Sequence, residues 1–182
     1  LILRGARQVG KTTVVNEFGS QFDNYLYFKL ERNENAKLFE MEIPLDDLVN
    51  MLYASVGKVK KEGTTLVFID EIQNSPKTIA LLRYFYEQRP DLYVIAAGSL
   101  LENLVDIKVS FPVGRVQYLA LRPCSFSEFL GAIGKNNLLA VLSQKAEYTV
   151  ALHEQLMHLF NQYTIVGGMP EVVANYIRNG NF

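Results

Sequence analysis

The chain has 182 residues, enough for one well-packed domain or for one domain with a small appendage. Its 18 basic and 19 acidic residues give a net charge of −1, so the overall charge does not call for nucleic acid as a partner. A single cysteine, Cys124, excludes an internal disulfide framework.

A short strand at residues 1–4 is followed by a glycine-containing loop and by a helix at residues 11–18. The segment Gly5–Thr12 fills every fixed position of the phosphate-binding pattern G-x-x-x-x-G-K-S/T. Its glycines let the backbone amides face one point, where the helix dipole adds positive charge. Lys11 would neutralise the terminal phosphates of ATP, and the Thr12 hydroxyl would be one ligand of Mg²⁺. A glycine turn that matches by chance is the alternative reading of this motif alone. The residues expected to line the nucleotide are Gly5, Ala6, Arg7, Gln8, Val9, Gly10, Lys11, Thr12 and Thr13.

The second predicted strand covers residues 25–31, and residues 35–61 are expected to form two helices, the second beginning near Pro44. The run 66–69 is apolar throughout and bounded by turn residues, which is typical of a strand buried on both faces. Two acids follow it directly, at positions 70 and 71. Paired carboxylates are costly in a packed core, so we expect them at the carboxyl edge of the sheet, where ligands bind in open α/β sheets.

Each of these two acids has a candidate role in phosphate chemistry. Asp70 would accept hydrogen bonds from Mg²⁺-bound water, as a Walker B acid does, and is the second residue expected at the metal. Glu71 would activate a water molecule for attack on the terminal phosphate. A solvated strand end that merely starts a turn is the alternative reading of the pair.

The next predicted helix begins at Pro76, and the apolar run 92–97 after it predicts a further buried strand. That strand leads to Ser99, whose hydroxyl is a candidate for contact with the terminal phosphate or the attacking water. An ordinary helix N-cap is the alternative role for Ser99.

A fifth strand is predicted at residues 115–121. Arg115, at its start, is a candidate charge sensor or arginine finger, with a surface salt bridge as the alternative. Strands that alternate with helices through the first two thirds of the chain predict an α/β fold, with a parallel sheet of about five strands and helices on both faces.

The last third of the sequence predicts helices only. Residues 125–128 have the form of a capping box, which starts a helix. The two histidines lie five residues apart and there is no cysteine cluster, so we expect no zinc site. Three more helices are predicted at residues 140–146, 153–163 and 170–178.

The sequence predicts a cytoplasmic protein with no membrane partner. Its longest apolar stretch, residues 92–101, is far shorter than the roughly 18 residues of a membrane span. No basic and then apolar leader opens the chain. The first strand is only four residues long before the loop, and the chain stops at Phe182 just after a predicted helix, so we expect a fragment of a longer protein.

These motifs occur in an order that resembles a family of prokaryotic AAA-like P-loop ATPases whose full-length members carry a C-terminal DUF4143-type domain. The resemblance spans nearly the whole chain, and its narrower motifs are Asp-Glu-Ile-Gln, Pro-x-Ser-Phe-x-Glu-Phe and Gly-Gly-Met-Pro-Glu. The family pattern has Leu where Cys124 stands, and it includes residues before the first strand and after the last residue of this chain. The segments that carry the resemblance are Gly5–Thr12, Leu66–Gln73, Ala97–Leu100, Gly114–Arg115, Leu121–Leu130 and Gly167–Glu171.

The resemblance implies a five-stranded ATPase core in which the Ser99 strand lies between the strand before the glycine loop and the strand before Asp70. Ser99 would then sit in a sensor position. It also implies a division into an ATPase core, residues 1–124, and an incomplete helical lid, residues 125–182.

Our leading hypothesis is a Mg²⁺-dependent ATPase that binds ATP and ADP and drives a C-terminal output domain absent from this chain. A nucleotide-dependent switch with negligible turnover uses the same residues and remains open. A DNA-directed ATPase rests only on what relatives do, and the near-zero net charge does not support it. The residues do not define the protein partner, the oligomeric state or the preference for adenine over guanine.

Overall fold

The computed structural model describes residues 1–99, 114–143 and 149–180. By its internal contacts the chain divides into two compact units, Leu1–Leu121 and Arg122–Phe182, and each is described by itself. No helix in the described ranges is long and apolar enough to cross a membrane.

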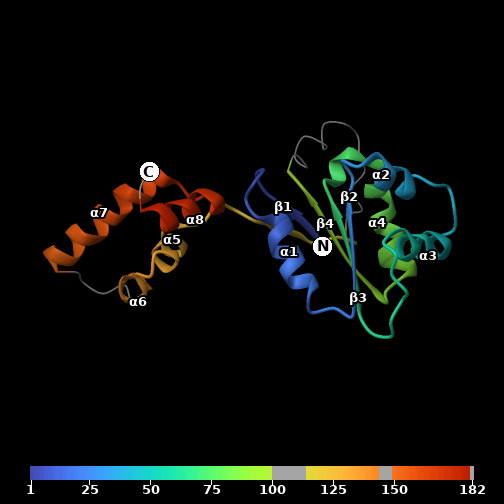
Figure 1. Ribbon diagram of the computed structural model, residues 1–182, viewed down its shortest axis with the longest axis horizontal. Coiled ribbons are helices and arrows are strands. Elements are labelled where there is room, and N and C mark those ends of the chain that lie inside the picture. The colour runs from blue at the N-terminus through green and yellow to red at the C-terminus, as the bar shows by residue number, and fades with distance from the viewer. Residues whose placement is uncertain (100–113, 144–148, 181–182) are drawn as a thin grey trace. The chain divides into compact units, whose positions relative to one another are not determined.

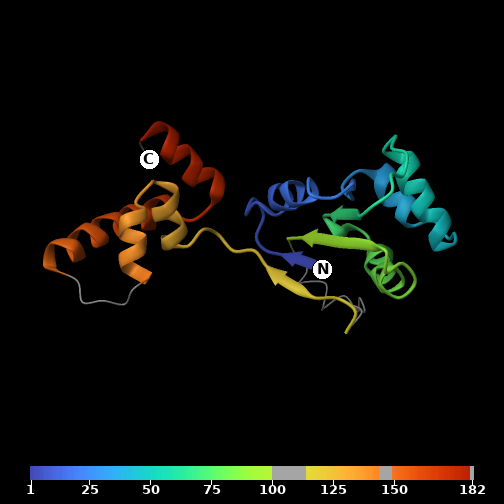
Figure 2. The same cartoon turned by 90° about the horizontal axis from the view of Figure 1, so that it is seen from below.

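The first unit is built on a parallel sheet with the strand order β2-β3-β4-β1-β5 (Figure 1). This confirms the prediction of a five-stranded α/β fold, and β4 lies between β1 and β3 as the resemblance implied. Figure 2 shows β1, in blue, between β4 and β5. The strands are β1 (Ile2–Arg4), β2 (Asn24–Lys29), β3 (Thr65–Asp70), β4 (Leu92–Gly98) and β5 (Tyr118–Ala120).

Strand β5 is shorter than the seven residues predicted at 115–121. Among the described strands it pairs with β1, which has three residues, so this pairing is limited to that length. Hydrogen bonding continues for one residue on each side, where the amide of Leu121 donates to the carbonyl of Arg4 and the amide of Ile2 donates to that of Gln117.

Helices cover both faces of the sheet, because alternate strand residues point to opposite sides. On one face, Leu66 and Phe68 of β3 belong to the same apolar cluster as Val15 of α1 (Lys11–Gly19). On the other face, Val67 and Ile69 pack in a cluster with residues of three further helices. Those helices are α2 (Asn33–Phe39), α3 (Leu45–Ser55) and α4 (Pro76–Gln88).

All six residues of β3 are buried, as the apolar run predicted. Because the strands are parallel, their carboxyl ends meet at one edge of the sheet. Arg4 is in register with Gly98, and Asp70 is in register with Ala97. The chain segments that leave β1, β3 and β4 therefore start side by side.

The described residues of the second unit form four helices. The capping box at Ser125 is confirmed, since its hydroxyl accepts from the Glu128 amide and the Glu128 carboxylate accepts from the Ser125 amide. The predicted helix at 140–146 begins earlier, at Asn136, and its last three residues lie outside the described part of the chain. The helices are α5 (Phe126–Ala132), α6 (Asn136–Ser143), α7 (Val150–Val166) and α8 (Pro170–Asn179).

Candidate functional site

The loop between β1 and α1 requires glycine at both of its ends. Gly5 has a φ of 155°, and a Cβ atom there would lie 2.2 Å from the carbonyl oxygen of Leu121. Gly10 has a φ of 93° and forms the N-cap of α1, and no side chain caps that helix. The first turn of α1 therefore presents its backbone N–H groups toward the loop, which is the usual arrangement of an anion-binding helix N-terminus.

Lys11 lies over this loop with only 7% of its surface exposed. Its ammonium group donates to the carbonyl oxygens of Gly5, at 2.8 Å, and Ala6, at 2.7 Å. Burial lowers the pKa of Lys11, while the nearby carboxylates of Glu71 and Asp70 act in the opposite direction. A buried ammonium group and two carboxylates thus share this edge of the sheet.

The contact that joins the loop to the acids is a hydrogen bond from the Thr12 hydroxyl to Asp70 Oδ2, at 2.7 Å. It connects residues 58 positions apart in the chain. Asp70 is 2% exposed, and its other oxygen, Oδ1, accepts from the Glu71 amide at 3.0 Å. The hydroxyl and carboxylate oxygens of this pair are hard donors, which fit Mg²⁺. The described residues contain no group of three or more His, Cys, Asp or Glu side chains that could hold a metal by itself.

Glu71 adopts an unusual backbone conformation at the end of β3. Its φ is 56°, in the left-handed region, and among the described non-glycine residues only Gln8 of the loop shares a positive φ. The chain turns at this point into a short 3₁₀ turn, η1 (Ile72–Asn74). The half-buried Glu71 side chain accepts a hydrogen bond from the amide of Gln73. Strained backbone of this kind is often found at functional sites.

Ser99 follows β4 directly and therefore lies at the same edge as Asp70. Its Oγ atom is buried and has no hydrogen-bond partner within the part of the chain that the structure describes. The residues after it, from 100 to 113, lie outside the described part, so its alternative role as a helix N-cap stays untested.

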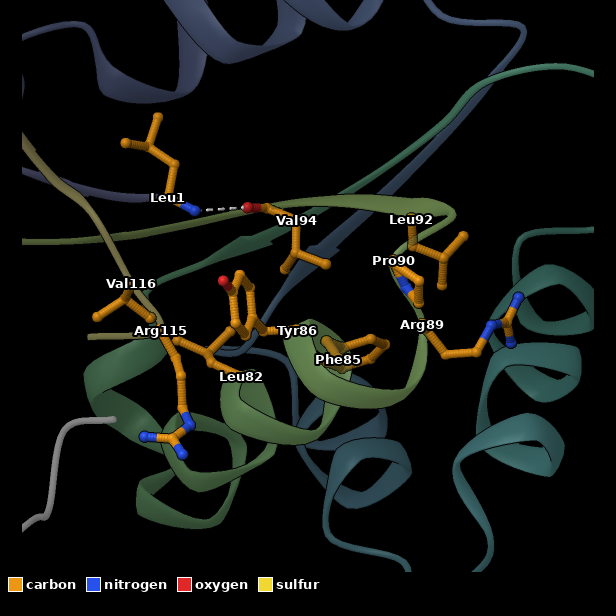
Figure 3. A pocket seen from close by; sticks show the side chains of 10 residues that line it. All are labelled: Leu1, Leu82, Phe85, Tyr86, Arg89, Pro90, Leu92, Val94, Arg115 and Val116. Atoms are coloured by element: carbon orange, nitrogen blue, oxygen red, sulfur yellow. Dashed lines mark hydrogen bonds between the residues drawn. The ribbon is translucent and has the colours of Figure 1, made fainter. Parts of the chain in front are cut away.

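Arg115 lies at the opposite edge, because it precedes β5 and β5 runs parallel to β1. Its Nε atom donates to Glu87 Oε1 at 2.6 Å. Figure 3 shows Arg115 next to Val116 and Leu82. These residues line a pocket of about 220 Å³ together with Leu1, Leu92 and Val94, at the amino ends of the strands. Within one chain the structure does not bring Arg115 to the glycine loop.

Two side chains at the carboxyl edge of the sheet, Tyr27 and Gln73, are not among the predicted site residues. Tyr27 of β2 donates its hydroxyl to Asp70 Oδ2 at 3.2 Å and stacks on Phe68 of the neighbouring strand. Burial, followed by the charge of Asp70, raises the pKa of Tyr27 to about 12, so its hydroxyl stays a donor at neutral pH. Gln73, the last residue of the Asp-Glu-Ile-Gln motif, donates its side-chain amide to Glu71.

The chain matches the family model described as AAA domain over residues 1–130. No curated protein matches it. Among solved structures, it is similar to the Drosophila ORC bound to DNA, at 12% identity and a TM-score of 0.50, over 98% of this chain and 53% of that chain. It is also similar to the Aeropyrum pernix ORC1 protein in complex with DNA, at 13% identity and a TM-score of 0.47, over 98% of this chain and 58% of that chain.

A third similar structure is Cdc6p from Pyrobaculum aerophilum, at 12% identity and a TM-score of 0.46, over 71% of this chain and 40% of that chain. At such identities a structural likeness supports the fold alone. By the coverages given above, the chain spans about half the length of the solved proteins to which it is similar.

Proposed function

The chain belongs to the AAA domain family, and on that premise we propose that it binds ATP and hydrolyses it with Mg²⁺ at the carboxyl edge of its sheet. The observation that carries this proposal is the 2.7 Å hydrogen bond between Thr12 and Asp70. This contact supports the proposal because it joins the glycine loop to the end of the strand that carries both acids.

In this proposal the loop residues 5–13 and the first turn of α1 surround the phosphates. Lys11 donates to the terminal phosphate oxygens, which replace the loop carbonyls as its acceptors. Thr12 would hold Mg²⁺ directly and Asp70 would hold it through metal-bound water, and the metal when bound would offset the charge of the phosphates.

Glu71 accepts a proton from the attacking water, whose oxygen forms the new bond to the terminal phosphorus. The bond from that phosphorus to the bridging oxygen breaks, which yields ADP and phosphate. The buried Ser99 hydroxyl, which has no hydrogen-bond partner in the described ranges, donates to a terminal phosphate oxygen or to the water.

The direct test is a titration of the chain with a fluorescent ATP analogue, followed by a steady-state assay of phosphate release. We expect saturable binding that unlabelled ATP reverses, and hydrolysis that stops when EDTA removes Mg²⁺. Failure of ATP to compete would contradict the proposal. Tight binding without phosphate release would instead identify a nucleotide-dependent switch, which is the rival function for the same residues.

Tyr27 provides a second prediction, since its hydroxyl orients Asp70 from the neighbouring strand. We expect Tyr27→Phe to raise the Mg²⁺ concentration needed for half-maximal hydrolysis by about 10-fold, because loss of a hydrogen bond that orients a carboxylate around the metal weakens metal binding. The stacking on Phe68 remains in this variant. A Mg²⁺ titration of the hydrolysis rate measures the effect.

Tyr25→Phe is the matched control, because Tyr25 lies in the same strand and its hydroxyl donates to Asn16 instead. Its Mg²⁺ requirement should equal that of the wild-type chain. An equal requirement in Tyr27→Phe would show that the hydroxyl has no influence on the metal site.

A further inference from the structure

We propose that Gln73 is a positioning residue for Glu71, holding the carboxylate in the orientation that accepts a proton from the attacking water. This inference rests on the proposed function, because it needs Glu71 to act on water. It gives a role to the last residue of the Asp-Glu-Ile-Gln motif, which the proposed function leaves unused.

The side-chain amide of Gln73 donates to Glu71 Oε2. The opposite orientation of the amide would place its oxygen against the carboxylate, so chemistry requires the nitrogen to face Glu71. Only one carboxylate oxygen is engaged in this way. The hydrogen bond from Gln73 engages Oε2 alone and leaves Oε1 to accept a proton.

The backbone of Glu71 is fixed on both sides. Its amide donates to Asp70 Oδ1 at 3.0 Å, and its carbonyl accepts from the Asn74 amide at 3.0 Å. Ile72, which is fully buried, anchors the 3₁₀ turn between them. The remaining freedom of Glu71 therefore lies in its side-chain torsions, and the hydrogen bond from Gln73 restricts these.

Gln73 is also anchored from the side of α4. Ser75, fully buried, follows the turn and caps α4 by accepting from the Thr78 amide at 3.3 Å. Its own hydroxyl donates to Glu40 Oε1 at 3.1 Å. The donor that meets Glu71 thus comes from a turn held at both ends, which is what a positioning residue requires.

The other end of the Gln73 amide argues against a role in packing alone. Its Oε1 atom is buried and has no hydrogen-bond partner among the described residues. A buried acceptor without a partner lowers stability, whereas an apolar side chain of similar length would fill the same space without that loss. The amide is thus unfavourable for folding at one end and is used by Glu71 at the other.

The test compares Gln73→Met, Glu71→Gln and the double variant with the wild-type chain. We expect Gln73→Met to lower kcat about 10-fold to 100-fold, as a small misplacement of a reacting group does, with the Kd for ATP unchanged. The double variant should be no slower than Glu71→Gln alone, because Gln73 acts only through Glu71. The Tm of Gln73→Met should equal or exceed that of the wild type, whereas it should fall if the hydrogen bond to Glu71 served only to stabilise the turn.

Asn74→Ala serves as the matched control, since Asn74 is the exposed next residue of the same turn, and it should leave kcat unchanged. Should Gln73→Met fail to fold, Gln73→Glu replaces it and should slow turnover at least as much, by setting a second carboxylate against Glu71.

Two groups of outcomes are distinguishable. An unchanged or faster kcat in the Gln73 variants, or a double variant slower than Glu71→Gln, overturns this inference alone. A wild-type chain without turnover, or Glu71→Gln at the wild-type rate, overturns the proposed function and this inference with it.

Discussion

Glu71→Gln should lower the kcat for ATP hydrolysis by about 100-fold to 10,000-fold, the range that a positioned general base contributes. The amide has the size and shape of the carboxylate but cannot accept the proton of the attacking water. The Kd for ATP should stay nearly unchanged, because the loop, Lys11 and the Thr12–Asp70 pair are intact. Stability should also be preserved, since glutamine can still accept the hydrogen bond from Gln73 through its carbonyl oxygen. Single-turnover phosphate release and an ATP titration measure the two quantities separately.

Glu62→Gln is the matched control for this experiment. Glu62 is exposed and precedes β3, so it lies at the opposite end of the strand that Glu71 follows. It should hydrolyse ATP at the wild-type rate. Equal rates in Glu71→Gln and the wild type would remove Glu71 from the chemistry and leave the loop as a binding site only.

Much of the fold could be predicted from sequence because its strands carry strong local patterns. The apolar run before Asp70 predicted a strand buried on both faces, and β3 is buried along its entire length. The capping box predicted the start of α5 correctly, since both of its reciprocal hydrogen bonds are local. The edge of the sheet at which Asp70 lies followed from the direction of parallel strands.

The contacts within the site could not be predicted in the same way. The hydrogen bond from Tyr27 to Asp70 depends on the register between β2 and β3, which no local pattern specifies. The left-handed backbone of Glu71 is rare for this residue type. The conformational propensity of glutamate therefore does not predict the turn that brings Gln73 to it. Long-range register and local strain together assemble this site.

Two expectations were made for Arg115, a position at the start of the fifth strand and a contact with the nucleotide, and they are incompatible within one chain. A strand predicted to start at this residue must place it at the amino edge of a parallel sheet, while the glycine loop leaves from the carboxyl edge. The structure has it at the amino edge, paired with Glu87, which also pairs with Arg83. The direction of the strand alone was sufficient to separate it from the loop of its own chain.

Lys11→Ala should weaken ATP binding by about 10-fold to 100-fold, because a hydrogen bond to a charged group contributes about 1.5–3 kcal/mol and about 1.4 kcal/mol is a factor of ten in Kd. The local charges strengthen this expectation. Without the ammonium group of Lys11, the carboxylates of Asp70 and Glu71 would face the negatively charged phosphates of ATP with no opposing charge from this side chain. Alanine is a good helix former, so α1 should persist. Competition titrations with ATP and AMP test the assignment, since the proposed function puts the terminal phosphates of ATP at Lys11 and the loss should therefore be much larger for ATP.

Lys37→Ala removes an exposed lysine from the helix α2 and controls for the loss of one positive charge. Its affinity for ATP should match that of the wild type. If Lys11→Ala bound ATP as well as Lys37→Ala, the phosphates could not lie at the first turn of α1, and the proposed function would fail whatever the turnover of the wild-type chain. If Lys11→Ala lost ATP and AMP equally, the lysine would support the loop itself, through its bonds to the carbonyls of Gly5 and Ala6, and not the terminal phosphates. A selective loss of ATP is therefore the result that separates phosphate recognition from loop stability.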